Sequence, residues 1–334
     1  MIEPEPFHLG VLVFPGCVRS AAVVPGDVLA LANRLAAPGP GPGPMQAQWV
    51  CARGTGEVDC EGLRFQAEGM ALNGTRPPAW DALLVPGFSH EGSDWRPTLA
   101  KLAPEIALIQ TWSDLGRPLL ASCTGVILLA AAGVLDGLPA TTSWWLIHAA
   151  QRHHPEVSWQ PSDLLCAAAG RVTAAGLTAY HDLTLWLVQQ HLGDDLARQT
   201  GKLLLLEPGR SSQAPYLAQT VADGTGPALL ERAQHWLNQR LNTPWTLSKL
   251  AAHCHTSERT LLRRFRQSLG VTPVQYTQQL RVERAKALLE GSTLSLEAIA
   301  EHCGYLDVST LRKVFKHWTQ LTPREYRQRF GLRV

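Results

Sequence analysis

The stretch PLLASCTGVILLAAAG, residues 118–133, indicates the fold class of the N-terminal part of this 334-residue chain. Its first five residues, from Pro118 to Ser122, form an apolar run typical of a buried strand. Thr124 and Gly125 then open an apolar segment that predicts a helix, and Cys123 lies at the sharp break between the two. A strand that turns directly into a helix is the repeating unit of α/β folds.

The segments on either side of this stretch continue the same alternation. A parallel sheet covered by helices on both faces is therefore expected, and ligands of such sheets bind outside the carboxyl ends of the strands. Gly87 and Cys123 both lie at the carboxyl ends of predicted strands, so they should border one pocket. The predicted strands are 8–14, 46–52 and 81–87, with a hairpin or edge segment at 58–68 and strand-like stretches within 157–175; the predicted helices are 23–36, about 97–115, about 144–153 and about 180–206.

A change of character divides the chain into an N-terminal domain, residues 5–206, and a C-terminal domain, residues 227–334. Residues 207–226 are rich in Gly, Pro, Ser and Ala, a composition typical of linkers. The C-terminal domain has 17 Lys and Arg against 8 Asp and Glu, a net charge of +9, whereas the rest of the chain has 13 against 20, a net charge of −7. This asymmetry predicts an anionic partner for the C-terminal domain alone.

The C-terminal domain contains a duplicated unit. LSKLAAHCHTSERTLLRRFRQSLGVTPVQY (247–276) and LEAIAEHCGYLDVSTLRKVFKHWTQLTPREY (296–326) share a His-Cys pair, a Thr-Leu pair, a Phe, a Thr-Pro pair and a Tyr at matching positions. Agreement at this density indicates a duplicated supersecondary unit. Each copy predicts two helices joined by a tight turn, at about 246–268 and 295–318, with Thr246 and Ser257 as helix caps in the first copy. We therefore expect an all-α domain with tandem helix-turn-helix units.

The second helix of each unit carries a basic face. Leu261 and Phe265 lie four residues apart and should share a buried face, which leaves the opposite face to read base edges and neutralise phosphates. A helix from Thr272 to about Leu289, about 25 Å long, would space the two recognition helices for successive major grooves. The alternative is a solvated basic face on an ordinary helical bundle. The predicted DNA-binding residues are Arg259, Thr260, Leu262, Arg263, Arg266, Val308, Ser309, Arg312, Lys313 and Lys316.

These tandem units resemble the DNA-binding domain of the AraC/XylS family of transcription regulators. The resemblance implies double-stranded promoter DNA as a partner and base-facing side chains on both recognition helices. It also suggests a homodimer formed through the N-terminal domains. One departure is His255 in the first turn, where the second unit has Gly304, because glycine is common in the family at that place.

The N-terminal domain also resembles a known family. The motifs FHLGVLVFPG, ALLVPG, ASCTGVILLAAAGVLDG, PATTSWW and TAAGLTAYHDLTLWLV are similar to a PfpI-like domain of the class I glutamine amidotransferase superfamily. The resemblance implies a flavodoxin-like parallel-sheet sandwich. Regulators of the GlxA type fuse such a domain to an AraC-type C-terminus, which is the order of domains in this chain.

Cys123 stands where relatives with this domain place a nucleophile, which needs a base and a group that orients the base. In PfpI-type hydrolases a His follows the Cys directly, but here Thr124 follows. In the fused regulators a His commonly stands at Ser143, and in reactive relatives an acidic residue stands at Ala21. His181 and the following Asp182 are the remaining candidates for a base. Three roles stay open for Cys123: the nucleophile of a cysteine-dependent amidase or hydrolase, a thiol redox sensor or ligand contact, or an unreactive residue.

The sequence therefore predicts a transcription regulator, not an enzyme, whose N-terminal domain senses a small-molecule effector. The predicted ligand pocket comprises Gly87, Phe88, Cys123, Thr124 and Ser143. No cofactor or metal is expected, because the seven cysteines form no CxxC pair. The N-terminus lacks the features of a signal peptide and no apolar run approaches membrane-spanning length, so a cytoplasmic protein without a membrane partner is expected.

Overall fold

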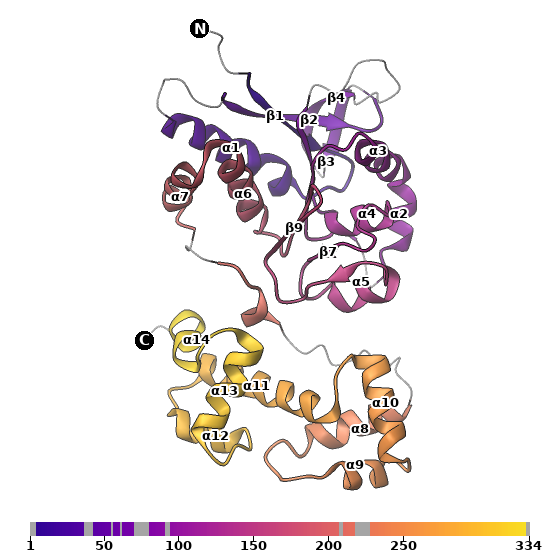
Figure 1. The fold of residues 1–334 in the computed structure, drawn as a ribbon, viewed down its shortest axis with the longest axis vertical. Coiled ribbons are helices and arrows are strands. Elements are labelled where there is room, and N and C mark those ends of the chain that lie inside the picture. Colours follow the sequence, from indigo (N-terminus) through magenta and orange to yellow (C-terminus); the bar gives the residue numbers. More distant parts are fainter. Residues whose placement is uncertain are drawn as a thin grey trace. The chain divides into compact units, whose positions relative to one another are not determined.

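The computed structural model of the chain describes residues 5–36, 43–54, 56–60, 62–69, 80–90, 94–206, 210–217 and 228–331. The chain divides into two compact units, Met1–Gln213 and Ala214–Val334. Figure 1 shows an α/β fold in the first unit and an all-helical fold in the second. Within the described ranges, no helix is both long enough and apolar enough to cross a membrane.

The first unit is built on a mixed sheet of eight strands in the order β3-β4-β2-β1-β5-β6-β10-β9. The six strands from β4 to β10 in this order run parallel to one another. The two outer strands, β3 and β9, run antiparallel to the strands beside them. The strands are β1 (Phe7–Leu12), β2 (Met45–Cys51), β3 (Gly56–Cys60), β4 (Leu63–Gly69), β5 (Ala82–Val85), β6 (Leu119–Ser122), β9 (Leu165–Ala168) and β10 (Arg171–Ala174), with a separate pair, β7 (Pro139–Ala140) and β8 (Ser158–Trp159). The expected α/β fold class, with a parallel sheet core, is confirmed.

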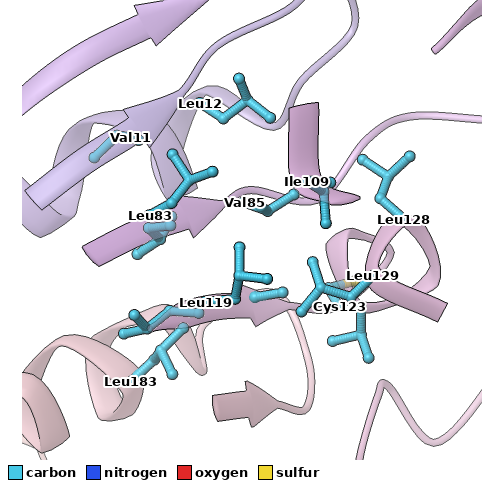
Figure 2. Close-up of a cluster of buried hydrophobic side chains, with 14 of the residues drawn as sticks. Val11, Leu12, Leu83, Val85, Ile109, Leu119, Cys123, Leu128, Leu129 and Leu183 are labelled. Carbon is cyan, nitrogen blue, oxygen red and sulfur yellow. The ribbon is translucent and has the colours of Figure 1, made fainter. Parts of the chain in front are cut away.

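Helices cover both faces of this sheet (Figure 1). One layer contains α1 (Arg19–Leu35), α6 (Tyr180–Leu192) and α7 (Asp194–Leu203); on the other side lie α2 (Arg96–Lys101), α3 (Ala103–Asp114), α4 (Gly125–Ala131) and α5 (Ile147–His153). Figure 2 shows Leu83 and Leu119 on the adjacent strands β5 and β6, with Ile109 of α3 and Leu183 of α6 packed near them. All four side chains are fully buried, so the central strands lie in a continuous apolar core.

Two helices that the sequence predicts as continuous are each interrupted in the structure. The segment 180–206 is divided at Gly193, which ends α6 and has a φ of 91°, a conformation that favours glycine. The segment 97–115 is divided at Leu102, between α2 and α3. The periodicity of apolar residues continues across both breaks, which explains why the prediction joined them.

The second unit contains seven α-helices among its described residues. They are α8 (Ala228–Asn238), α9 (Leu247–His253), α10 (Glu258–Leu269), α11 (Pro273–Gly291), α12 (Leu296–His302), α13 (Val308–Thr319) and α14 (Pro323–Phe330), preceded by the 3-10 helix η1 (Ala214–Tyr216). Two apolar clusters form, one around each helix-turn-helix unit, and α11 contributes to both: Tyr276 and Leu280 to the first, Val282 and Leu289 to the second. The predicted connecting helix therefore exists and joins two small cores.

The predicted linker, residues 207–226, is bound to the protein over part of its length. The Arg210 side chain forms an ion pair with Asp182, and Gln213 is buried in the first unit. Ala214 begins η1, where Tyr216 packs edge-on against Phe330 of the second unit. Residues 210–217 are therefore not a free linker, because buried polar and aromatic contacts hold them at both ends; residues 207–209 and 218–226 lie outside the described part of the chain.

Candidate nucleic-acid interface and elbow site

Side-chain caps fix the start of every helix in the two helix-turn-helix units. Thr246 and Ser257 accept hydrogen bonds from the backbone N–H groups of Lys249 and Thr260, which confirms both predicted caps. In the second unit, Ser295 and Asp307 accept from Ala298 and Thr310 in the same way. Since each cap satisfies an N–H group that the helix leaves free, both recognition helices begin at defined residues.

The two recognition helices, α10 and α13, each bury one face and expose the other. Leu261 and Phe265 are fully buried on α10, as are Leu311 and Phe315 on α13. All ten predicted DNA-binding residues lie on these two helices. Seven are exposed, namely Arg259, Arg263, Arg266, Ser309, Arg312, Lys313 and Lys316, and three are partly buried, namely Thr260, Leu262 and Val308.

Two of the predicted base-facing hydroxyl groups are engaged in capping. Thr260 Oγ1 accepts a hydrogen bond of 3.0 Å from the Ser257 hydroxyl, and the Ser309 hydroxyl donates to the Asp307 carboxylate. The bond from Ser309 is the largest of the effects that lower the pKa of Asp307 to about 2, so this carboxylate is ionised at neutral pH. Sequence reasoning missed Asp307, although an Asp before a helix is a capping signal. The arginine and lysine side chains of the two faces are all exposed and provide the charged donors there.

The two turns have the same backbone geometry in spite of their different residues. His255 has a φ of 51° and Gly304 a φ of 76°, both in the left-handed region. Each turn is closed by equivalent hydrogen bonds, from Thr256 N to Ala251 O at 3.0 Å and from Tyr305 N to Ala300 O at 2.9 Å. The His255 departure therefore leaves the first turn intact.

The N-terminal unit contains the expected elbow between β6 and α4. Cys123 has a φ of 54°, which is strained for a residue with a side chain, and its N–H donates to Ala174 O of β10 at 3.0 Å. Gly125, at the start of α4, has its Cα close to the carboxyl end of β5: an added Cβ would lie 2.5 Å from Val85 O and 2.6 Å from Pro86 O. A glycine is therefore required for α4 to approach β5 this closely.

The structure brings the five predicted pocket residues together. Thr124 Oγ1 accepts from Phe88 N at 2.6 Å and donates to Phe88 O at 2.8 Å, and an added Cβ at Gly87 would lie 2.9 Å from the same oxygen. The Ser143 hydroxyl donates to Cys123 Sγ at 3.0 Å and accepts from Gly176 N at 3.1 Å. These polar groups satisfy one another, and Figure 2 shows Cys123 beside the apolar side chain of Leu129.

At the elbow, burial outweighs the hydrogen bonds from Ser143 and Thr124 that favour the Cys123 thiolate. Burial is the main cause that raises the pKa of Cys123 above its ordinary value, so the thiol is protonated at neutral pH. His181 Nδ1 lies 3.0 Å from Thr178 O, its ring stacks on Tyr180, and Asp182 pairs with Arg210. The Phe88 N–H, the kind of backbone donor that stabilises an oxyanion, is occupied by the Thr124 hydroxyl.

Gln213 connects the elbow to the end of the first unit, and sequence reasoning placed it in the linker. Its amide donates to Thr142 O at 2.8 Å and its carbonyl accepts from Trp144 N at 2.9 Å. Thr142 Oγ1 in turn donates to Cys123 O at 2.8 Å. A single amide in a stretch rich in Gly, Ser and Pro has no sequence signal that distinguishes it from a solvated side chain.

Comparisons with known proteins agree with this architecture. Residues 250–329 match the family model described as a helix-turn-helix domain. The HTH-type transcriptional regulator GbdR of Pseudomonas aeruginosa is 29% identical over 227 residues, which cover 67% of this chain and 61% of GbdR. The HTH-type transcriptional regulator ArgR of the same species is 27% identical over 98% of this chain and 95% of its own length.

Among solved structures, an AraC family transcriptional regulator from Pseudomonas putida is 22% identical and covers 60% of this chain and all of that chain, with a TM-score of 0.47. The match to GbdR leaves more than a third of that relative unmatched. The helix-turn-helix match and these HTH-type relatives show that residues 250–329 form a helix-turn-helix domain, in a chain that is similar to transcriptional regulators.

Proposed function

We propose that this protein binds promoter DNA in a sequence-specific way through α10 and α13, and that its N-terminal unit binds a small-molecule effector without acting as an enzyme. The observation that carries the proposal is the matched pair of exposed basic faces on two capped helices connected by α11. Arginine can make paired hydrogen bonds to guanine in the major groove, and neighbouring lysines neutralise phosphates. A DNA partner implies a cytoplasmic protein, and family resemblance suggests a homodimer.

The elbow is the proposed effector site, and the contacts of Gln213 suggest how it would act. An effector that displaced the segment 141–144 would disturb the three hydrogen bonds of Gln213 to that segment, which involve Thr141, Thr142 and Trp144. The next residue, Ala214, already belongs to the second unit. Such a ligand shifts the balance of conformations only by its difference in affinity for the two states.

Arg263→Ala is expected to weaken binding to a preferred DNA duplex by roughly 10- to 100-fold, or about 1–3 kcal/mol, and to relax the preference for one base pair. Arg263 is exposed opposite Leu261 and Phe265, at the centre of the proposed face. The probe is a duplex selected from a random-sequence pool by the full-length protein. Its binding by wild type should also weaken steeply with added salt, since each phosphate contact releases counterions.

Arg264→Ala is the matched control, because it removes the same charge from the flank of the same helix, next to the buried side. It should weaken binding less, and equally for preferred and random duplexes. Equal losses for the two variants on every duplex, or binding that is insensitive to salt, would contradict sequence-specific recognition by α10.

Cys123→Ala is expected to leave the affinity for DNA within about twofold of wild type. Cys123 belongs to the N-terminal unit and not to α10 or α13, and its thiol carries no charge at neutral pH. A panel of amide and ester substrates should give equal background hydrolysis with both proteins. If wild type hydrolyses a substrate and Cys123→Ala does not, the hydrolase alternative is correct and the proposed non-catalytic role is wrong.

A further inference from the structure

Two cysteines outside the elbow are in direct contact. Cys17 Sγ and Cys60 Sγ lie 3.2 Å apart, although the residues are 43 positions apart in the chain. Cys17 follows β1 in the loop before α1, and Cys60 is the last residue of β3. Cys60 Sγ also donates to Phe14 O at 3.3 Å, which leaves the Cys17 thiol to donate to Cys60.

The contact distinguishes this pair from the other five cysteines, all of which are described by the structure. Cys123 contacts the Ser143 hydroxyl, Cys166 contacts the Asp163 carboxylate, and Cys51 accepts from Arg53 N. No second pair of thiols is in hydrogen-bond contact among the described residues. Only Cys17 and Cys60 are therefore placed to join without a rearrangement of secondary structure.

We propose that Cys17 and Cys60 are a modification site that a peroxide converts into a reversible disulfide. In the first step, one thiol loses its proton and its thiolate attacks a peroxide oxygen; the O–O bond breaks, a sulfenic acid forms, and the hydroxide that leaves takes up the proton to become one water. In the second step, the partner sulfur displaces the sulfenic hydroxyl, the S–S bond forms, and the hydroxyl leaves as a second water with the proton of the partner thiol. Two thiols are oxidised and one hydrogen peroxide is reduced to two waters, and an external dithiol reverses the reaction.

The position of β3 provides a route for the oxidant. Both sulfurs are buried, but β3 is the outermost strand of the sheet and pairs with β4 alone. Opening of this edge requires no change in the central strands, and edges open at lower free energy than the core. Burial raises the pKa of Cys17 to about 12 and also raises that of Cys60, so the reaction should be slow at neutral pH and accelerate with rising pH.

The loop that carries Cys17 contacts the elbow. Val18 N donates to Gly87 O at 2.8 Å, Ser89 N donates to Gly16 O at 3.0 Å, and Cys17 forms an isolated β-bridge with Phe88. Gly87 and Phe88 are the residues that contact Thr124 at the elbow. A disulfide would therefore tie the β3–β4 hairpin to the loop beside the elbow. That it would alter effector response rests on the proposed function; the disulfide itself does not.

The test maps the cysteines of the full-length protein. Reduced protein is treated with hydrogen peroxide, the remaining thiols are blocked with N-ethylmaleimide in denaturant, and the peptides are identified by mass spectrometry. We expect the loss of two of the seven thiols, a peptide linked through Cys17 and Cys60, and complete recovery with dithiothreitol. Cys60→Ser should abolish the linked peptide, whereas the control Cys166→Ser, a buried cysteine that contacts a carboxylate, should retain it.

Peroxide treatment that modifies other cysteines while Cys17 and Cys60 remain open to N-ethylmaleimide would overturn the proposal. The wild-type map decides this even if Cys60→Ser does not fold. The linked peptide is detected without DNA, so a disulfide in a protein that fails to bind any duplex would refute the proposed function and leave the modification site standing.

Discussion

Gly304→Ala is expected to destabilise the second helix-turn-helix unit by roughly 3–5 kcal/mol, enough to leave α12 and α13 largely unfolded. An added Cβ would lie 2.2 Å from Leu241 O and 2.7 Å from Asn242 Cα, and neither backbone atom can move without displacing the core around the first helix-turn-helix unit, to which Leu241 belongs. The φ of 76° adds about 1–2 kcal/mol for any residue with a side chain, and overpacking adds about 1–3 kcal/mol or more. Hydrogen exchange of peptides from 295–318 in the full-length protein measures the loss.

His255→Gly is the matched control for this prediction. His255 occupies the equivalent turn of the first helix-turn-helix unit with a φ of 51°, and its side chain is exposed. Glycine relieves the strain of the left-handed conformation but loses more conformational entropy on folding, so a net gain of about 0.5–1 kcal/mol is expected. Equal and small effects of both substitutions on hydrogen exchange would show that the close approach of Gly304 to Leu241 does not stabilise the second helix-turn-helix unit.

Gly125→Ala is expected to destabilise the N-terminal unit by about 3 kcal/mol. The added Cβ would meet two backbone carbonyl oxygens, at 2.5 and 2.6 Å, so α4 would have to move away from β5. For a unit of this size, about 3 kcal/mol corresponds to a fall in Tm of roughly 6–12 °C, which calorimetry of the full-length protein resolves. The same movement displaces Thr124 from Phe88 and Cys123 from Ser143.

Gly201→Ala provides the control within another helix of the same unit. Its added Cβ would lie 3.4 Å from Leu185 Cδ1, an ordinary contact with the end of a side chain, and alanine is the better helix former by about 1 kcal/mol. We expect Tm to stay the same or rise slightly. A fall as large as that of Gly125→Ala would mean that the loss of helical glycines, and not the contact of α4 with β5, determines the result.

The sequence predicts those parts of the structure that depend on local chemistry. Apolar runs specify β5, β6 and α4, and the repeated Thr-Pro and Phe positions specify α10, α11 and α13. Contacts between distant residues have no such local signal. The contact between Cys17 and Cys60 depends on the position of an edge hairpin, which the spacing of the cysteines along the chain does not indicate.

The site shows the same division. The carboxyl-end rule for parallel sheets correctly groups Gly87 with Cys123, but it does not predict that the Thr124 hydroxyl occupies Phe88 N–H. Composition predicts a change of character after residue 206, whereas the two compact units of the structure divide between Gln213 and Ala214. Composition cannot predict that Gln213 is buried, because its burial depends on hydrogen bonds to Thr142 and Trp144, which lie 71 and 69 positions away in the chain.

The segment 210–217 determines where this protein can be cut or fused. Lys286 is only 5% exposed, and its ammonium donates to Leu217 O as well as to Glu283, so a fragment that begins at residue 227 would leave a buried cation short of an acceptor. A stable fragment of the helical unit should therefore start no later than Ala214. A hybrid regulator that borrows the other half must keep Gln213, and the junction for such a swap is a single peptide bond.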